Sequence, residues 1–242
     1  MITGPRTGPL DADQVLEAYP WPAAGRWVRA MMVTTLDGAA AGPDGLSGSI
    51  SSDVDKAVFN AVRRLADVVL VGAGTIRAER YGPMVAKPED ADARAAQGSA
   101  PAPVLAVVSP SLDLPWEEPM FAESTSRPIV ITLSSADSQR LDVAREHAEV
   151  VVLGDSLDVA RLLDLLEQRG LRRIVCEGGP TLLASIASEG LLDEADITVS
   201  PMFAGGAHTS PTPVFTSPAR FDLAHVIMGD GFLMNRYLRT TR

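Results

Sequence analysis

The sequence predicts an α/β protein built on a mostly parallel sheet, with helices on both faces and an antiparallel hairpin at its C-terminal edge. Short, continuously apolar runs recur along the chain, and the segments between them carry apolar residues at helical spacing. The last two strand candidates, 221–228 and 232–239, are separated only by Gly229-Asp230-Gly231, a sequence typical of hairpin turns. The alternation of strands and helices favours a parallel sheet, and the hairpin makes that sheet mixed.

The elements follow one another without a linker between two separate cores. Residues 1–26 are rich in Pro and Gly around a candidate helix at 11–19, and we interpret them as an N-terminal arm ahead of a single domain at 27–242. A strand at 27–36 leads into a Gly- and Ser-rich loop and a helix capped by Ser51 or Ser52. Residues 81–103 are polar and rich in proline, which predicts a surface excursion or flexible flap. The other predicted strands are 67–71, 104–108, 128–133, 149–153, 174–176 and 196–200, and the other predicted helices are 134–146, 156–169 and the segment from Pro180 to Gly190.

The composition excludes several classes of protein. The 242 residues carry a net charge of −10 and are 46% hydrophobic, which indicates a sizeable core and argues against nucleic-acid or anionic-membrane partners. A single cysteine, Cys176, excludes a disulfide framework, and the three histidines, His147, His208 and His225, are too scattered for a zinc site. No leader and no apolar run of about 18 residues is seen, so no membrane association is expected and the expected location is the cytoplasm.

The turn after the strand at 174–176 suggests a ligand site. The strand runs into Glu177, and Gly178-Gly179-Pro180-Thr181 then opens a helix. Such a turn points backbone N–H groups and the positive end of the helix dipole beyond the carboxyl end of the strand, and two glycines let a ligand touch the main chain. We interpret it as the seat of a cofactor phosphate or diphosphate. The alternative is an ordinary strand–helix turn with glycines for chain reversal.

A second glycine turn follows the strand at 67–71. Gly72 and Gly74 stand where a dinucleotide fingerprint has its first two glycines, but Arg77 takes the place of the third. No acidic residue closes a following strand at the usual distance. This motif alone is therefore weak support for dinucleotide binding.

Several blocks, in this order, resemble one family. VTTLDGAAA, SGSIS, RRLADVVLVGAGTIRAE, RRIVCEGGPTLL, GLLDEADITVSP and FAGG are similar to the reductase domain of riboflavin biosynthesis, the RibD C-terminal domain, and more closely to the stand-alone pyrimidine reductase-like proteins of actinobacteria. The resemblance extends from about Trp27 to the C-terminus. It implies a dihydrofolate reductase-like fold, NADPH as the cofactor and a homodimer.

The resemblance also implies roles for individual residues. Ser47, Arg63 and Glu177 match substrate positions, although the helical spacing alone would make Arg63 a solvated arginine. Glu79 and Asp37 are the candidate proton donors, with a turn-capping role as the alternative for Asp37. With the two glycine turns included, the candidate cofactor residues are Val33, Ser49, Gly72, Gly74, Thr75, Ser109, Gly178, Gly179, Pro180, Thr181 and Leu182.

The chain departs from the family pattern at several positions. The zinc-deaminase segments that precede the reductase in bifunctional relatives are absent, so deamination is not expected. Ala39 replaces a basic residue, and the Arg-x-Asp-Asp-Pro run reads Arg77-Ala78-Glu79-Arg80-Tyr81. Fewer cations bind a phosphorylated sugar less well. Three functions therefore stay open: an NADPH-dependent reductase of a pyrimidine- or pterin-like heterocycle, similar to 5-amino-6-(5-phosphoribosylamino)uracil reductase; a dihydrofolate reductase; and a non-catalytic NADPH-binding protein.

Overall fold

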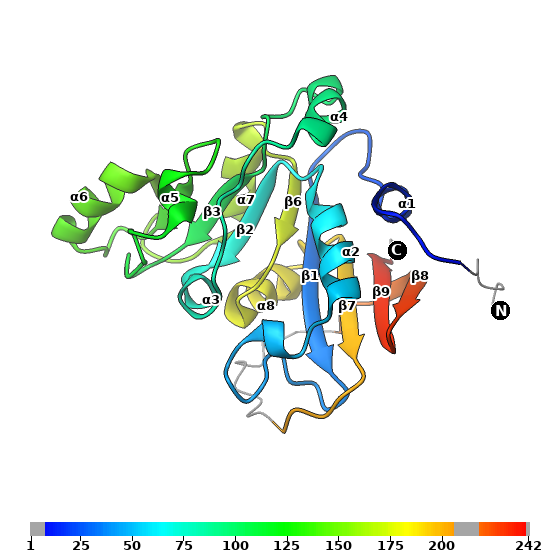
Figure 1. The fold of residues 1–242 in the computed structure, drawn as a ribbon. Helices are drawn as coiled ribbons and strands as arrows, with labels where there is room; N and C mark the ends of the chain where they lie inside the picture. Colours follow the sequence, from blue (N-terminus) through cyan, green and yellow to red (C-terminus); the bar gives the residue numbers. More distant parts are fainter. Residues whose placement is uncertain (1–7, 206–217, 241–242) are drawn as a thin grey trace.

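The framework of the computed structural model, which describes residues 8–205 and 218–240, is a nine-stranded sheet in the order β5-β4-β3-β2-β6-β1-β7-β9-β8 (Figure 1). Neighbouring strands from β5 to β7 pair in parallel, whereas β9 pairs antiparallel with both β7 and β8. The predicted mostly parallel sheet with a C-terminal antiparallel hairpin is confirmed.

The bounds of the elements agree closely with the apolar pattern of the sequence. The strands are β1 (Trp27–Thr35), β2 (Val68–Gly72), β3 (Val104–Val108), β4 (Ile129–Thr132), β5 (Glu149–Val152), β6 (Arg173–Cys176), β7 (Glu194–Ser200), β8 (Phe221–Gly229) and β9 (Phe232–Arg239). The helices are α1 (Ala12–Ala18), α2 (Asp53–Arg63), α3 (Ala73–Ala78), α4 (Ala91–Ala96), α5 (Pro119–Ala122), α6 (Ser138–His147), α7 (Val159–Gln168) and α8 (Pro180–Ser188), with short 3₁₀ turns η1 (Ser47–Ser49) and η2 (Pro88–Asp90).

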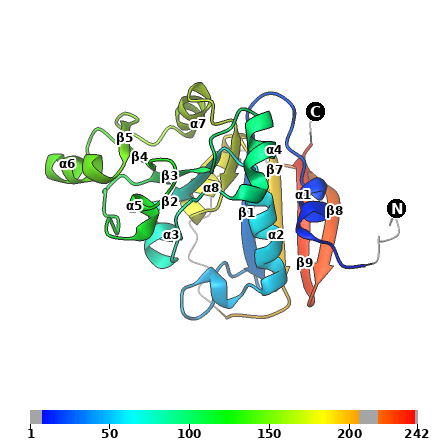
Figure 2. The ribbon, with the colours of Figure 1, turned by 45° about the horizontal axis from the view of Figure 1, so that its top comes forward.

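Helices cover both faces of the sheet (Figure 2). On one face, α7 and α8 pack their leucines and isoleucine against alternate residues of β1, β2, β3, β4 and β6. On the other face, α3, α5 and α6 cover the half from β2 to β5, and α1 and α2 cover β1, β6 and β9. Because successive strand residues point to opposite faces, central strands covered on both faces have to be apolar throughout.

Side-chain caps determine where the helices begin. Ser52, one of the two serines predicted to cap α2, accepts a hydrogen bond from Asp55 N at 3.3 Å. The helices predicted to begin at 134 and 156 begin later, because Asp137 and Asp158 cap α6 and α7. Each of these carboxylates accepts a hydrogen bond from the N–H three residues on, as helix N-caps do.

Residues 81–103 are mostly exposed, in agreement with the surface excursion that the sequence predicts, but they contain regular structure that the alternative of a flexible flap does not include. This stretch contains η2 and α4, and the Arg94 side chain on α4 is buried. Arg94 Nε donates to Ala100 O at 2.6 Å, and Nη1 donates to Arg64 O at 2.8 Å and to Ala66 O at 2.9 Å. One arginine thus ties α4 to the end of α2, an arrangement that composition alone does not reveal.

A buried ionic cluster attaches the N-terminal segment to the sheet. Glu194 accepts from Arg236 Nε at 2.6 Å and lies 3.0 Å from Arg29 Nε, and both arginines are buried. Arg29 Nη2 donates to the carbonyl of Tyr19, at the end of α1, at 3.2 Å, and its guanidinium lies over the Trp21 ring at 4.0 Å. The division of the chain into an arm and a domain stays a prediction, but α1 packs on its own chain.

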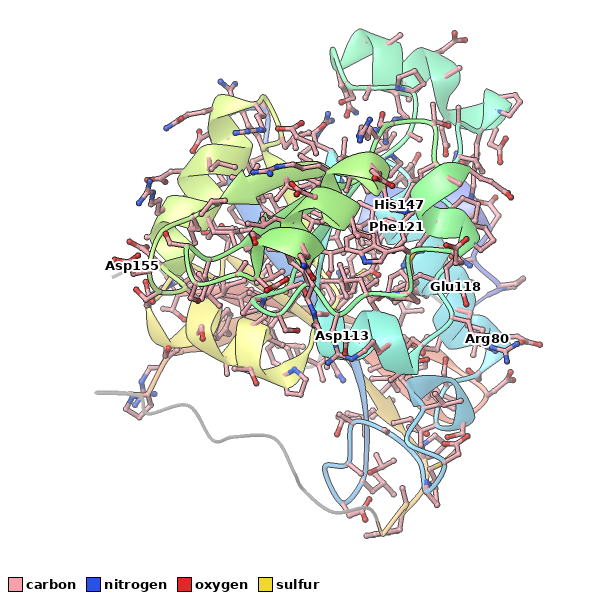
Figure 3. All side chains as sticks on the ribbon, turned by 90° about the vertical axis from the view of Figure 1, so that its left-hand side faces the viewer. Arg80, Asp113, Glu118, Phe121, His147 and Asp155 are labelled. Atoms are coloured by element: carbon pink, nitrogen blue, oxygen red, sulfur yellow. The ribbon has the colours of Figure 1, made fainter. Side chains whose placement is uncertain are left out.

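Cys176 and His147, residue types that can bind metals or react, lie in apolar or aromatic packing in the structure. Burial raises the pKa of the Cys176 thiol to about 12, so this cysteine is an inert core residue. Phe121 and His147 lie close together in Figure 3, and both pack on the ring of Trp116. His208 lies outside the described residues. Within residues 8–205 and 218–240, no helix is long and apolar enough to cross a membrane and no three His, Cys, Asp or Glu side chains gather as metal ligands would.

Candidate active site

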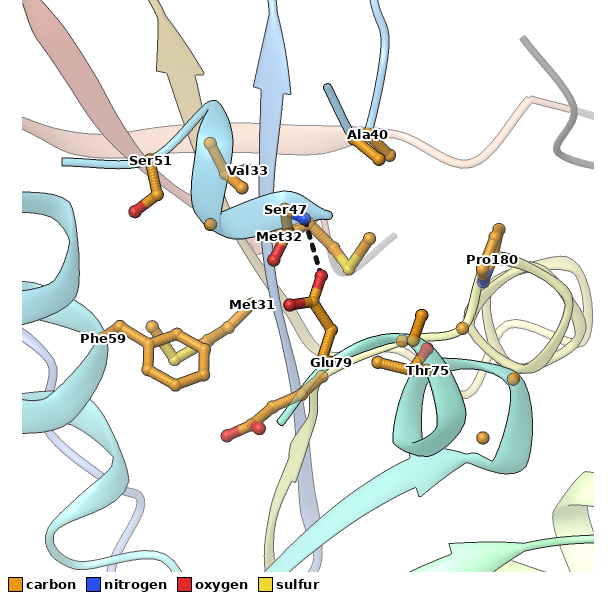
Figure 4. A pocket seen from close by; sticks show the side chains of 18 of the residues that line it. Met31, Met32, Val33, Ala40, Ser47, Ser51, Phe59, Thr75, Glu79 and Pro180 are labelled. Atoms are coloured by element: carbon orange, nitrogen blue, oxygen red, sulfur yellow. Dashed lines mark hydrogen bonds between the residues drawn. The ribbon is translucent and has the colours of Figure 1, made fainter. Parts of the chain in front are cut away.

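A cavity of about 1520 Å³ lies at the carboxyl ends of β1, β2, β3 and β6. Its walls come from α2, α3, the first turn of α8 and the loop that follows β1. In Figure 4, Ser51 and Phe59 lie on one side of the cavity and Thr75 and Pro180 on the other, with Met32 and Glu79 between them. Since single-ligand pockets are usually about 300–1,000 Å³, a cavity of this size has room for a cofactor and a substrate together.

The predicted glycine turn closes one end of this cavity. Gly178 has φ +91°, and a Cβ on it would lie 3.3 Å from Met32 Sδ, so only glycine suits the position. In the part of the chain that the structure describes, the N–H groups of Thr181 and Leu182 in the first turn of α8 donate to no protein acceptor. Free donors at the positive end of a helix dipole form a binding site for an anion.

Two predicted substrate residues pair in the middle of the cavity. Arg63 on α2 grips the carboxylate of Glu177, at the end of β6, with both Nε and Nη2, and the Nε to Oε1 distance is 2.6 Å. The Arg63 guanidinium also lies 4.5 Å from the centre of the Phe59 ring. Burial lowers and the charge of Glu177 raises the pKa of Arg63, with a net upward shift. Glu177 therefore holds the Arg63 side chain on the cavity wall, and the alternative of a solvated arginine is wrong.

Tyr81 completes this group. Its Oη donates to Glu177 Oε2 at 3.0 Å, and its ring centre is 5.7 Å from the Arg63 guanidinium. Burial, followed by the negative charge of Glu177, raises the pKa of Tyr81 well above its ordinary value, so the hydroxyl stays a donor. Both oxygens of Glu177 are thus engaged within the protein. Arg63 Nη1 makes no hydrogen bond within the described residues, so Arg63 keeps N–H groups for a ligand of the cavity, and Glu177 holds the guanidinium in place.

Glu79 lies between the two ends of the cavity. One of its oxygens, Oε1, accepts a hydrogen bond from Ser47 N at 2.6 Å, which links the end of α3 to the loop after β1 (Figure 4). Its other oxygen makes no hydrogen bond within the described residues. The side chain is half-buried, so it stands in the cavity with a free oxygen.

Asp37, the other candidate proton donor, does not belong to the walls that the described residues form. Its carboxylate accepts hydrogen bonds from Thr35 Oγ1, from Gly205 N at 2.9 Å and from Ala204 N at 3.2 Å. The Thr35 hydroxyl, followed by the Gly205 N–H, lowers the pKa of Asp37 to about 2. A carboxyl group ionised from about pH 3 upward has no proton to give at neutral pH. Asp37 accepts from Thr35 in its own turn, near the role that the turn-capping alternative gives it, and also connects that turn to the 204–205 main chain.

Replacing Asp37 with asparagine is expected to leave the pH dependence of kcat/KM unchanged between about pH 5 and pH 9. The group is already ionised throughout this range because its pKa is lowered to about 2, and the amide retains an acceptor for the 204–205 main chain. Steady-state rates over this range test the expectation, with Glu79→Gln as the comparison. A limb of the profile that disappears in Asp37→Asn would restore Asp37 as the proton donor.

Two candidate cofactor residues also lie outside the cavity walls. Ser49 Oγ donates to Asp44 Oδ1 at 2.7 Å and to Leu46 O at 2.9 Å, so it braces its own loop. Ser109 is fully buried, and its neighbour two residues on, Ser111, lines the cavity instead. A strand end places only every second side chain on a given side, and the sequence pattern does not say which residue ends the strand.

The cavity brings together most of the predicted site and adds residues that the sequence did not reveal. The predicted residues on its walls are Val33, Ser47, Arg63, Gly72, Gly74, Thr75, Glu79, Glu177, Gly178, Gly179, Pro180, Thr181 and Leu182. The added ones include Asp55, Lys56, Phe59, Tyr81, Ser111, Thr198 and Asn235. Asp55 carried no sequence signal beyond that of an acidic residue in the first turn of a helix, and Tyr81 lay in the stretch predicted as a flap.

Comparison with known proteins identifies similar chains. The model of the family described as RibD C-terminal domain matches residues 26–228. A protein of Archaeoglobus fulgidus named 2,5-diamino-6-ribosylamino-4(3H)-pyrimidinone 5′-phosphate reductase is 30% identical over 182 residues, which are 75% of this chain and 82% of the relative. A protein of the same name from Methanothermobacter thermautotrophicus is 35% identical over 175 residues, 71% of this chain and 76% of the relative.

A solved structure agrees with these matches. The crystal structure of a pyrimidine reductase-like protein from Corynebacterium diphtheriae superposes with a TM-score of 0.77 at 26% identity. The alignment covers 90% of this chain and 93% of that one, so the two share the fold along nearly their whole length.

Proposed function

The chain belongs to the RibD C-terminal domain family, and from this premise we propose that it is an NADPH-dependent reductase of a ribosylamino-pyrimidine 5′-phosphate. The names of its relatives from two archaea support this substrate class. The observation that carries the proposal is the continuity of one cavity, which joins the free N–H groups at the start of α8 to the Arg63–Glu177 pair. The proposed cofactor half, at the start of α8, and the proposed substrate half, at Arg63 and Glu177, thus border the same cavity.

The close packing of the two glycine turns supports the assignment of a dinucleotide diphosphate to this end of the cavity. A Cβ on Gly179 would lie 3.2 Å from Thr75 Oγ1, and one on Gly72 would lie 3.2 Å from Gly179 N, so the two glycine turns pack main chain against main chain. At Gly74 a Cβ would meet nothing within 4 Å, so this residue borders open space. We assign the diphosphate to the N–H groups of Thr181 and Leu182. When bound, NADPH supplies the hydride; the protein orients the two reactants and excludes water.

The preference for NADPH over NADH is assigned to the end of β3. Ser111 and Arg77 both line the cavity, and Arg77 Nη1 donates to Asp113 O, two residues beyond Ser111, at 2.8 Å. A hydroxyl in the loop after β3 and a guanidinium on the adjacent helix α3 suit an adenosine 2′-phosphate. The family resemblance implied Ser109 as a cofactor residue at this place; we assign the contact to Ser111 instead, together with Arg77, because both line the cavity.

The substrate side is assigned to the pair of Arg63 and Glu177. The N–H groups of Arg63 that Glu177 does not engage suit a substrate carbonyl or hydroxyl oxygen. Lys56, about two helical turns before Arg63 on α2, also lines the cavity and is a candidate for binding the phosphate. One oxygen of Glu79 makes no hydrogen bond within the described residues. We assign to Glu79 the role of proton donor to the substrate nitrogen on which negative charge develops during hydride transfer.

Turnover measurements with reduced nicotinamide test the function. Purified protein is mixed with NADPH or NADH and with the 2-amino pyrimidinone, the corresponding uracil or dihydrofolate, and oxidation is followed at the nicotinamide absorbance. The expected result is NADPH oxidation with a ribosylamino-pyrimidine and slower oxidation of NADH. Oxidation with dihydrofolate alone would favour the dihydrofolate reductase alternative, and NADPH binding with no turnover would favour a non-catalytic binding protein.

We also propose that the protein is a homodimer located in the cytoplasm. The edge strand β8 exposes Leu223, Val226 and Met228, with exposed fractions of 54%, 38% and 74%, and β9 adds the exposed Leu233. Among the described residues β8 pairs only with β9, so its outer edge has main-chain groups that another strand could pair with. A second copy of the chain would cover this edge and the apolar side chains symmetrically. Sedimentation at micromolar concentration is expected to give twice the chain mass of 25.6 kDa, and a single-chain mass would contradict the dimer.

A further inference from the structure

The end of the cavity beneath α2 contains a carboxylate that the proposed hydride transfer does not use. Asp55 lies in the first turn of α2, half-buried, and lines the cavity. Apolar side chains line the same cavity, among them Met31, Val58, Phe59 and Met234. A polar group among apolar walls is the usual way in which a pocket orients a heterocycle.

Hydroxyl groups hold both oxygens of the Asp55 carboxylate. Thr198 Oγ1 on β7 donates to Oδ1 at 2.6 Å, and Ser51 Oγ donates to Oδ2 at 2.6 Å. Two short hydrogen bonds from different elements fix the orientation of the group before any ligand arrives. A carboxylate has about four acceptor sites, so each oxygen keeps one for a ligand.

No lysine, arginine or histidine of the described residues forms an ion pair with Asp55. Among the ion pairs of residues 8–205 and 218–240, none includes Asp55, whereas Glu177 and Glu194 are each paired with arginines. The N-terminal end of the α2 dipole stabilises the ionised form. The group is thus an oriented acceptor of two hydrogen bonds that faces a ligand cavity.

We propose that Asp55 recognises the N3–H and 2-amino group of a 2-amino-4-oxopyrimidine ring. These two donors lie side by side on the ring edge and match the two oxygens of a carboxylate. A uracil ring has the N3–H but carries a carbonyl oxygen at C2, which would face a carboxylate oxygen without a hydrogen between them. The pocket therefore selects the 2-amino ring both by attraction and by repulsion of the 2-oxo ring. This inference rests on the proposed function and names its substrate: the pyrimidine that still carries the 2-amino group.

Asp55 would also discriminate among the substrates that the sequence left open. A dihydropterin carries the same 2-amino-4-oxo edge, so dihydrofolate stays within the class of rings that Asp55 accepts. The deaminated uracil intermediate does not. The reaction that supplies the substrate is then the one that forms the ribosylamino-pyrimidinone, and removal of the 2-amino group would follow the reduction.

Paired substrates test the proposal. The wild-type protein is expected to reduce 2,5-diamino-6-ribosylamino-4(3H)-pyrimidinone 5′-phosphate with a kcat/KM about 10- to 100-fold higher than that for its 2-oxo counterpart. In Asp55→Asn this ratio is expected to fall to within about threefold of one, mostly through loss on the 2-amino substrate, because the amide can donate to a 2-oxo group. Asp53→Asn changes the same charge in the same turn, outside the cavity walls and fully exposed, and should keep the wild-type ratio. Equal rates with the two substrates in the wild type, or an unchanged ratio in Asp55→Asn, would overturn the proposal.

A binding experiment separates this proposal from the proposed function. Protein saturated with NADPH is titrated calorimetrically with 2,5,6-triaminopyrimidin-4-one and with 5,6-diaminouracil. Binding of the triamino ring at least about tenfold tighter supports the role of Asp55 even if neither phosphorylated substrate is reduced, in which case the proposed function alone fails. Equal binding with normal turnover leaves the function and removes the role of Asp55. Thr198→Val, which removes one orienting hydroxyl, is expected to reduce the preference by about threefold to tenfold and replaces Asp55→Asn if that variant does not fold.

Discussion

Replacing Glu177 with alanine is expected to destabilise the protein by about 3–5 kcal/mol and to lower kcat/KM at least about 100-fold. The Glu177 side chain is 2% exposed and that of Arg63 is 23% exposed, so the change leaves a largely buried guanidinium without its partner. The stability loss should fall toward the lower end of this range, because the remaining exposure lets water reach Arg63. Activity falls because Arg63 then leaves its position on the cavity wall. Urea denaturation and steady-state kinetics measure the two effects.

Two further variants show whether the pair acts as a unit. Tyr81→Phe removes the 3.0 Å hydrogen bond to Glu177 but keeps the ring beside Arg63, so a loss of about 1 kcal/mol in stability and less than about tenfold in kcat/KM is expected. Combining Arg63→Met with Glu177→Ala should cost less than the sum of the two single changes, because both remove the same contact. Additive losses would contradict a role for Glu177 in orienting Arg63.

Replacing Gly178 with alanine is expected to weaken NADPH binding by about 10- to 100-fold. The residue has φ +91°, a conformation that costs a side chain about 1–3 kcal/mol, and the new Cβ would lie 3.3 Å from Met32 Sδ. The turn has to change its path to relieve this strain, and the N–H groups at the start of α8 move with it. Titration followed by reduced-nicotinamide fluorescence gives the dissociation constant.

Gly98→Ala is the matched control for the strain alone. Gly98 also has a positive φ, +65°, but a Cβ there would meet nothing within 4 Å and the residue does not line the cavity. A modest loss of stability and an unchanged NADPH affinity are expected. Wild-type affinity in a folded Gly178→Ala protein would refute the assignment of the diphosphate to this turn.

The local patterns of the chain were sufficient for the fold class. The strand at 104–108 has the predicted bounds, and the hairpin around Gly229-Asp230-Gly231 is present as predicted. Hydrophobic periodicity, turn residues and helix caps are interactions over a few residues, so they can be recognised from the sequence alone. The surface position of 81–103 was predictable, but its helical turns were not, because the Arg94 side chain that anchors them donates to a carbonyl 30 residues away along the chain.

For the site, the sequence by itself determined the glycine turn and, through family resemblance, the residues that gather around it. Only the tertiary structure decided what those residues contact. It paired Arg63 with Glu177 across 114 residues, turned Asp37 toward the 204–205 main chain and brought Thr198 of β7 against Asp55 of α2. The physical reason is that a side chain's protonation and hydrogen bonding depend on groups that the fold brings close from distant parts of the chain, and no local pattern encodes which groups those are.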